Sequence, residues 1–352
     1  MFLNSIDYVY NWINLIVLLL LLLFCVAFFT LAERKFMGAI QRRKGPDVVG
    51  FWGFLQPMAD GFKLILKELI FPLRASIFLF IVGPLLVFVL SALGWITIPF
   101  GFGAIFDNLS LAILYNFITA SLNIYGLIIS GWASNSRYSY LGGIRATAQM
   151  ISYELVFGMI NVIIVLMTGS FNYSEIIISQ LGMWNIFPLF PIFILFLIVM
   201  LAETNRTPFD LAEAEAELVA GYNVEYSSIM FALFFLGEYA NMLLLSVFCV
   251  IYFLGGWLIP FSSSEDERYY SVFFIKVLVF CIFFIWVRAT LPRYRYDQLM
   301  LFGWKYFLPL IFGLFILYVG ILIGFGILKP NFNHLAFYQD LLFYKLQKVN
   351  KY

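Results

Sequence analysis

The sequence has 352 residues, of which 63% are hydrophobic and only 12% are charged, and its mean hydropathy is +0.95. A chain with so few charged residues cannot cover a water-facing surface, which excludes a soluble globular protein and a disordered one. The net charge of +1 hides an asymmetry, because Lys and Arg gather in a few connecting segments while acids gather in others and inside the apolar runs. No nucleic-acid partner is expected. Apolar runs recur from end to end without a long polar block, which predicts a single integral membrane domain over residues 1–352.

Eight apolar segments are long enough to cross a bilayer, since a membrane helix needs roughly 20 mostly apolar residues. Gly83-Pro84 falls inside the second segment, and membrane helices tolerate both residue types. The predicted fold class is therefore all-α, a polytopic bundle of transmembrane helices. The predicted spans lie near 11–32, 76–98, 109–130, 148–168, 187–203, 229–254, 271–289 and 305–328.

Basic residues are concentrated in four connections between these spans. Loops 33–75, 131–147, 204–228 and 290–304 hold most of the 21 Lys and Arg residues. By the positive-inside rule these loops face the cytoplasm or the mitochondrial matrix, and both termini face the opposite side. The N-terminal MFLNSIDYVYNW lacks the features of a secretory signal or a transit peptide, so the first span is expected to be retained.

The first of these loops contains a predicted amphipathic helix within LQPMADGFKLILKEL. Apolar residues recur there at helical spacing, while Asp60, Lys63 and Lys67 form the opposite face. Such a helix most simply lies in the membrane interface. The pattern alone assigns no function to Asp60.

The third loop, TNRTPFDLAEAEAELVAG, predicts a short helix that starts at Pro208 and stops near Gly221. Thr207 would cap its start, and a glycine suits a left-handed C-terminal cap. A solvated acidic helix is the simplest explanation for its acids. Asp210, Glu213 and Glu217 share one face of the predicted helix, and Glu215 points away from it.

Three further acids fall inside predicted spans: Glu154, which follows Tyr153, and Glu203 and Glu238. Placing an acid there costs roughly 2–3 kcal/mol, so such residues usually face a bundle interior or a water-filled cavity. A hydrogen bond between helices is one explanation, and a proton relay is another. If the spans pack as neighbours, these acids and those of the third loop would form a line from the inner surface into the membrane.

The inner ends of two spans also carry charge. The string ERK at residues 33–35 lies where the first span meets the interface. Arg288, Arg293 and Arg295 lie where the seventh span does. Arginines that reach from a helix end to the interface explain this pattern most simply. A guanidinium cluster beside apolar helices would instead orient the polar headgroup of a quinone.

Cofactor ligands are scarce in the sequence. Cys25, Cys249 and Cys281 lie singly in predicted spans, and His334 is the only histidine. No CxxC motif or Cys/His cluster exists that would hold zinc, haem or an iron–sulfur cluster. If the chain serves electron transfer, partner chains must hold the electron carriers.

Long strings distributed between about residues 20 and 305 resemble the quinone-site membrane subunits of respiratory complex I. They are LAERKFMGAIQRRKGPDVVG, FLQPMADGFKLILKE, GGIRATAQMISYELVFG, LAETNRTPFDLAEAEAELVAGYNVEY, FLGEYANM and WVRATLPRYRYDQLM. The resemblance implies a membrane subunit of a proton-pumping NADH:ubiquinone oxidoreductase, with ubiquinone as substrate and no catalytic residue in this chain. NADH, FMN and iron–sulfur clusters would be bound by partner subunits.

The resemblance also implies roles for individual residues. The membrane side of a quinone chamber would include Glu33, Arg34, Lys35, Asp60, Arg288 and Arg293. A path that couples quinone reduction to proton translocation would include Tyr153, Glu154, Glu203, Asp210, Glu213, Glu215, Glu217 and Glu238.

The implied partners are hydrophilic quinone-site subunits on the inner face, small and antiporter-like membrane subunits at the sides, and the lipid bilayer. The location would be the mitochondrial inner membrane, with both termini in the intermembrane space, or alternatively a bacterial plasma membrane.

Three other functions fit parts of the pattern. A membrane subunit of an energy-converting hydrogenase would share the fold, but the basic first loop and the arginine-rich loop after the seventh span favour the quinone enzyme. A free-standing ion–proton antiporter would use buried acids, yet no inverted repeat of broken helices is evident. A passive membrane anchor would need none of the intramembrane acids.

Overall fold

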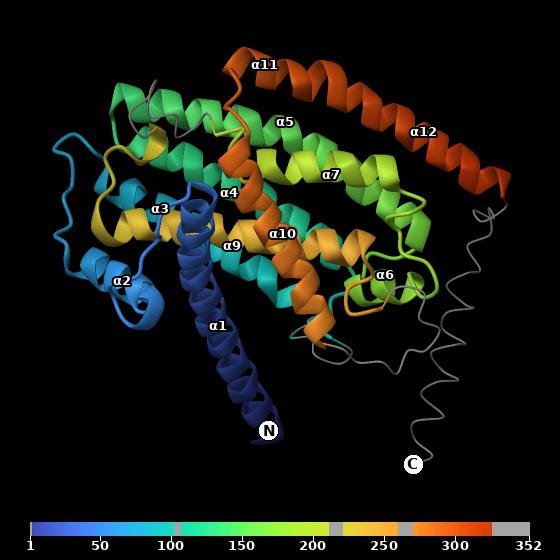
Figure 1. Cartoon of the computed structure of the whole chain (residues 1–352), viewed down its shortest axis with the longest axis horizontal. Coiled ribbons are helices and arrows are strands. Elements are labelled where there is room, and N and C mark those ends of the chain that lie inside the picture. The colour runs from blue at the N-terminus through green and yellow to red at the C-terminus, as the bar shows by residue number, and fades with distance from the viewer. Residues whose placement is uncertain (1, 102–105, 107, 211–220, 260–269, 326–352) are drawn as a thin grey trace. The chain divides into compact units, whose positions relative to one another are not determined.

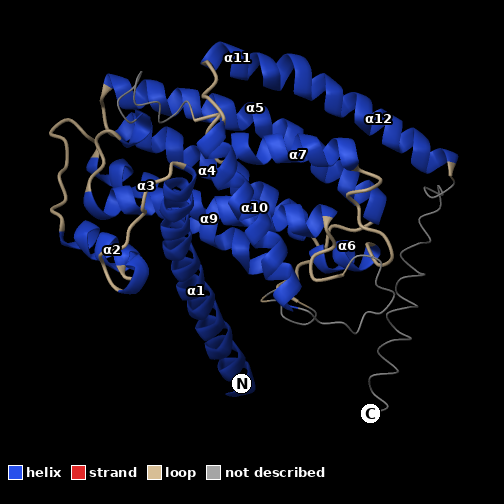
Figure 2. Cartoon of the chain, in the orientation of Figure 1, coloured by secondary structure: helices blue, strands red, loops and turns tan. Residues whose placement is uncertain are grey.

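A computed structural model of the chain describes residues 2–101, 106, 108–210, 221–259 and 270–325. Within these ranges the secondary structure is helical and contains no strand (Figure 2). The chain divides into two compact units, Met1–Ile311 and Phe312–Tyr352. The described part of the second unit is the remainder of one apolar helix, which ends at Gly324. The single domain over residues 1–352 stays a prediction.

The described residues include seven helices that are long and apolar enough to cross a membrane. An eighth apolar helix, α7, has 14 residues. These eight correspond to the eight predicted spans, so the all-α class is confirmed and the predicted count is close. The long helices are α1 (Phe2–Ile40), α3 (Ile77–Leu93, extended by η2, Gly94–Thr97), α4 (Ala112–Ala133), α5 (Arg137–Thr168), α9 (Ser228–Phe253), α10 (Tyr270–Thr290) and the continuous α11 (Tyr296–Leu301), η4 (Phe302–Phe307) and α12 (Leu308–Gly324).

Five shorter elements complete the described secondary structure. They are η1 (Phe51–Gly53), α2 (Gln56–Leu66), α6 (Tyr173–Ser179), α7 (Phe190–Glu203) and η3 (Gly221–Asn223). None of the residues of α2 is buried, and its apolar Met58, Phe62 and Ile65 are more than half exposed. An apolar face that the chain leaves uncovered agrees with the predicted amphipathic interfacial helix.

The core of the first unit is formed by α3, α4, α5, α7 and α9, which pack against one another. The C-terminal half of α9 is almost entirely buried. Short turns and hydrogen bonds bring the end of α4 together with the starts of α3 and α5 and with the segment that precedes α9. We call this side of the bundle, with Glu33 of α1 and Arg288 of α10, the charged end. The opposite end of the bundle, where α6 lies, is called the far end (Figure 1).

Helix α5 starts at Arg137, well before the predicted start at 148. The Ser136 hydroxyl caps it by accepting a hydrogen bond from the Ser139 N–H. Gly142, in the added part, packs against the backbone of Gly221 so closely that a Cβ atom would lie 2.7 Å from it. Hydropathy could not detect this extension, because it is stabilised by a cap and a backbone contact.

The helix predicted to start at Pro208 does not start there, and this prediction was wrong. Residues 207–210 form turns and bends. The Pro208 carbonyl accepts a hydrogen bond from Tyr294 N–H at 3.0 Å, and the Arg206 carbonyl accepts one from Phe209 N–H at 2.8 Å. Tertiary contact with the segment after α10 therefore replaces the first helical turn. The expected left-handed conformation is present at Gly221, whose φ is 62°.

Lys276 of α10 is buried at the far end, where it binds the turn that follows α9. Its ammonium donates hydrogen bonds to the carbonyls of Leu254, Gly256 and Leu258 at 2.7, 2.9 and 2.6 Å. It also lies 4.3 Å from the centre of the Trp184 ring. These contacts satisfy carbonyl groups that the end of a helix would otherwise leave without donors.

Candidate functional site

A buried charged network lies at the charged end and is centred on Glu33 of α1. The Glu33 side chain is only 3% exposed. It accepts hydrogen bonds from the Arg288 guanidinium of α10 and from the Tyr239 hydroxyl of α9. Arg206 lies on another side, with its Nη1 atom 3.9 Å from Glu33 Oε1. Two cations from different segments thus share one carboxylate.

Arg206 also reaches Glu238 of α9, and so links two acids. Its Nη2 atom lies 3.8 Å from Glu238 Oε2, and its guanidinium lies 4.5 Å from the centre of the Tyr239 ring. The Tyr222 hydroxyl donates a hydrogen bond to Glu238. Unit charges about 4 Å apart interact by roughly 4 kcal/mol at an effective dielectric constant of about 20. Arg206 thus lies within electrostatic range of both Glu33 and Glu238.

The other predicted chamber residues form pairs nearer the surface. Arg34 binds Asp60 at 2.7 Å, joining α1 to α2. Arg293 binds Asp210 at 2.9 Å. Lys35 donates to the Trp52 carbonyl. Both salt bridges are partly exposed, whereas the network around Glu33 is largely buried. Of the six predicted chamber residues, the structure thus pairs Glu33 with Arg288 and Arg34 with Asp60.

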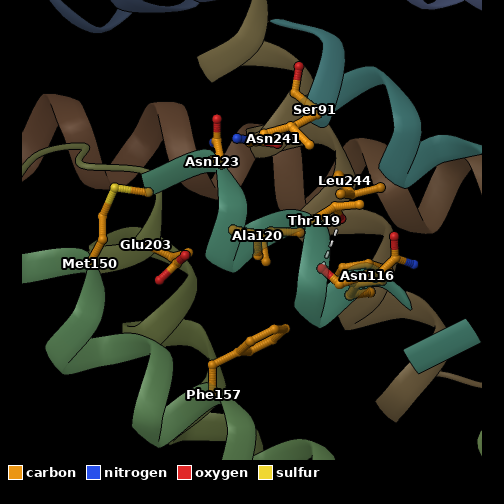
Figure 3. A pocket seen from close by; sticks show the side chains of 13 residues that line it. Ser91, Asn116, Thr119, Ala120, Asn123, Met150, Phe157, Glu203, Asn241 and Leu244 are labelled. Atoms are coloured by element: carbon orange, nitrogen blue, oxygen red, sulfur yellow. Dashed lines mark hydrogen bonds between the residues drawn. The ribbon is translucent and has the colours of Figure 1, made fainter. Parts of the chain in front are cut away.

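Two adjoining cavities lie among the acids predicted inside the spans. We call them the Glu238 cavity and the Glu203 cavity, with about 20 and 40 Å³ accessible to the centres of water molecules. Tyr222 and Glu238 line the first, and the second extends from Glu203 along α4 (Figure 3). The residues that line both cavities are Asn123, Met150, Glu203 and Asn241.

Glu203 ends α7 and faces this space with an unsatisfied oxygen. Its Oε2 atom is buried, and the described residues give it no hydrogen-bond partner. Glu154 of α5 lies close enough to act on Glu203 electrostatically, and it accepts a hydrogen bond from Ser121 of α4. Glu203 and Glu238 therefore share a cavity, and Glu154 lies within electrostatic range of Glu203.

The remaining residues predicted for the path have different surroundings. The Tyr153 hydroxyl donates to the Leu299 carbonyl at 3.1 Å, so this side chain joins α5 to α11. Asp210 binds Arg293. Glu213, Glu215 and Glu217 lie outside the described residues. In the part of the chain that is described, no three His, Cys, Asp or Glu side chains gather as a metal site would require.

Three members of the charged network were missed by sequence reasoning. Arg206 was counted only as a basic residue of an inner loop, and Tyr222 and Tyr239 are two of 21 tyrosines. One available signal was position, because Arg206 follows Glu203 within three residues and Tyr239 is adjacent to Glu238.

Comparison with known proteins places this geometry in a family. A family profile described as NADH dehydrogenase matches residues 13–319. The chain is 53% identical to NADH-ubiquinone oxidoreductase chain 1 of Chondrus crispus over 89% of its own length and 97% of the relative. It is also 53% identical to the Arabidopsis thaliana protein of the same name, covering 88% of the chain and 95% of the relative.

A bacterial relative is named as part of a corresponding enzyme. This NADH-quinone oxidoreductase subunit, from Paramagnetospirillum magneticum, is 51% identical over 91% of the chain and 94% of the relative. A profile match over most of the chain, together with identities above half at nearly full coverage, is sufficient for assignment. The chain belongs to the NADH dehydrogenase family.

Proposed function

We propose that the chain forms the membrane side of a ubiquinone chamber and relays the state of the bound quinone to an acidic proton path. The chain is a membrane subunit of a NADH:quinone oxidoreductase, as the relatives are named, and other complex I subunits are its partners. It is a multi-pass protein of a mitochondrial inner or bacterial plasma membrane.

The charged end has the chemistry that a quinone headgroup needs. Arginines and carboxylates are held there beside the exposed apolar face of α2 and the exposed apolar side of α1. The isoprenoid tail of ubiquinone would pack on the apolar surface, while the charged groups orient its carbonyl oxygens. Hydrophilic subunits would close the chamber and hold the iron–sulfur clusters and FMN, so this chain binds quinone without holding an electron.

The proposed orientation of the chain in the membrane follows from its basic loops. The charged end would face the matrix or cytoplasm, and both termini would face the other side. Small and antiporter-like membrane subunits would contact the chain laterally, and receive the signal that leaves the acidic path.

The observation that carries the coupling proposal is the position of Arg206 between Glu33 and Glu238, at 3.9 and 3.8 Å. Reduction of quinone to quinol consumes two electrons and two protons, which changes charge and proton demand near Glu33. Arg206 would pass that change to Glu238 by redistributing its interaction between the two acids. Glu238 and Glu203 share a cavity, and Glu154 lies beyond.

The test uses Glu203→Gln and Glu238→Gln in the assembled complex. Each change keeps the size of the side chain but removes its exchangeable carboxyl proton. We expect NADH–quinone turnover to fall severely or to lose its coupling to proton pumping. NADH oxidation by a hydrophilic artificial acceptor should be unchanged, because that reaction bypasses the membrane subunits.

The matched control is Glu175→Gln, which alters an exposed acid in the first turn of α6. This variant should pump and turn over like the unaltered complex. Normal pumping by both Glu203→Gln and Glu238→Gln would remove these residues from the coupling path.

A further inference from the structure

The Glu203 cavity extends past the acids toward the far end along one face of α4. Asn116, Thr119 and Asn123 all line it, and their spacing of three and four residues places them on the same side of the helix (Figure 3). Asn123 lies at the level of Glu203. Asn116 is seven residues nearer the far end, about 10 Å along the helix axis at a rise of about 1.5 Å per residue.

Three buried oxygens around this cavity receive no hydrogen bond from the part of the chain that the structure describes. They are Oε2 of Glu203 and the Oδ1 atoms of Asn116 and Asn123. The two asparagines are each 5% exposed, and Asn241 contributes a further amide to the lining. Buried polar atoms in folded proteins nearly always have a partner, and ordered water supplies it when protein groups do not.

The dimensions and chemistry of the cavity suit water. About 40 Å³ is accessible to the centres of water molecules, and one water needs roughly 10–15 Å³ of such space. The Thr119 hydroxyl donates to the Asn116 carbonyl at 3.0 Å and the Ser91 hydroxyl to the Phe88 carbonyl at 2.8 Å. Neither hydroxyl proton is therefore available to satisfy the three oxygens, although both hydroxyl oxygens can accept from water.

At the far end of the cavity, polar contacts continue beyond Asn116. Its Nδ2 atom donates to Thr97 Oγ1 at 2.7 Å and to the Tyr173 hydroxyl oxygen at 2.8 Å. Thr97 follows α3 and Tyr173 begins α6, so both belong to the far end. The polar stripe on α4 thus spans the gap between the acids and the far end.

We propose that the Glu203 cavity binds a hydrogen-bonded file of water molecules and that this file is a branch of the proton path leading from Glu203 toward the far end. A proton that leaves the Glu203 carboxyl would join the first water, and each water would pass one proton to the next, with no change in electron count. The proposal that water binds there rests on the size of the cavity and on its unsatisfied oxygens. The conducting role rests on the proposed function.

The first test is structural and does not depend on activity. A cryo-EM structure of the native complex that resolves ordered water should show density within hydrogen-bonding distance of Glu203, Asn123 and Asn116. An empty cavity would overturn the proposal. Density with short oxygen contacts that appears only in sodium-containing buffer would also overturn it, because the same oxygens would then bind a cation.

The second test measures conduction with Asn116→Leu, which replaces an amide by an apolar group of similar size. In proteoliposomes, the variant should pump at most half as many protons per electron pair, while NADH–quinone turnover stays within about twofold. Asn161→Leu is the matched control: Asn161 is a buried asparagine of α5 with an unsatisfied Oδ1 atom, outside both cavities. Its pumping ratio should not change.

The outcomes separate this inference from the proposed function. If Glu203→Gln abolishes pumping and Asn116→Leu does not, the branch is refuted while the acidic path remains. If ordered water is present but Glu203→Gln pumps normally, the water site stands and the proton path fails. If Asn116→Leu does not assemble, Asn116→Ser leaves room for one more water and should retain pumping, and loss of pumping there would contradict the proposal.

Discussion

Glu238 and Glu203 line the same cavity, but their surroundings differ. Glu238 has an arginine at 3.8 Å and accepts a tyrosine hydrogen bond, whereas the described contacts leave an oxygen of Glu203 without a partner. A buried carboxylate with a counter-ion is held by its protein neighbours. A buried carboxylate without a counter-ion must find its hydrogen-bond partners in the cavity that it faces. The paired Glu238 is therefore held by protein charges, whereas Glu203 faces the cavity with an oxygen that no described residue satisfies.

Removing the shared cation should break the paired region most severely. Arg206→Met removes the arginine from Glu238, while Glu33 keeps Arg288, and an uncompensated buried charge costs about 3–5 kcal/mol. We expect little assembled complex on native gels, and little NADH–quinone turnover in what assembles. Assembly at normal levels with normal turnover would show that the two acids do not depend on Arg206.

A smaller loss is expected when one hydrogen bond to the network is removed. Tyr239→Phe deletes the hydroxyl that donates to Glu33 but keeps the ring beneath Arg206. Hydrogen bonds to charged groups contribute about 1.5–3 kcal/mol. The thermal midpoint of the complex should fall, and quinone turnover should fall with it.

Tyr226→Phe is the control for that change. This buried tyrosine donates to the neutral Ser130 carbonyl at 3.3 Å, so its loss should be smaller, about 0.5–1.5 kcal/mol. Equal losses of stability in the two variants would contradict a stronger hydrogen bond from Tyr239 to Glu33 than from Tyr226 to a neutral carbonyl.

A packing change at Gly142 should disturb Glu238 through Tyr222, which donates a hydrogen bond to it. In Gly142→Ala the new methyl group would lie 2.7 Å from Gly221 and 2.8 Å from the Tyr222 N–H nitrogen, and this backbone must move. We expect a loss of about 1–3 kcal/mol, typical of overpacking, and a displaced Tyr222 hydroxyl. The thermal midpoint of the complex would measure the loss of stability, and quinone turnover would measure the effect of the displaced hydroxyl. Gly313→Ala, with nothing within 4 Å of the added atom, should be neutral. A neutral Gly142→Ala would show that the contact is not rigid.

The smallest effect is expected at an exposed ion pair. Arg295 and Asp297 lie 3.9 Å apart and are 80% and 78% exposed. Such pairs contribute little because solvent and salt screen them. Arg295→Gln should therefore match the unaltered complex in stability and turnover, and a large loss would reveal a contact with a partner subunit.

Much of the fold could be predicted from the sequence, because lipid imposes its own length scale. Every predicted span has a corresponding helix in the structure. The limits were set by short-range contacts that hydropathy ignores: the Ser136 cap and the Gly142 contact extend α5, and the Pro208 carbonyl is used by Tyr294 instead of a helix. Tertiary hydrogen bonds decided the local structure in the last case.

The site could be predicted only as separate acids and bases. Glu154, Glu203 and Glu238 were identified because an acid inside a span is costly, and Glu33 was assigned to the chamber by the resemblance. Their connection depends on Arg206, whose role arises from three-dimensional packing between α1 and α9. The asparagines of α4 could not be identified as site residues from the sequence, because no sequence motif marks a functional amide in a membrane helix. It becomes informative only when its oxygen is seen to face a cavity.

The three hydrogen bonds that Lys276 donates to the turn after α9 have a consequence for how the chain inserts into the bilayer. A lysine inside a span costs up to about 2.5–3.5 kcal/mol to insert, and the described residues place no acid in a salt bridge with this one. The ammonium finds its acceptors in the backbone of the turn at 254–258, where Gly256 adopts a φ of 55°. Because α10 meets its acceptors only beside a folded α9, insertion of the two helices as a hairpin is favoured over their entry one at a time.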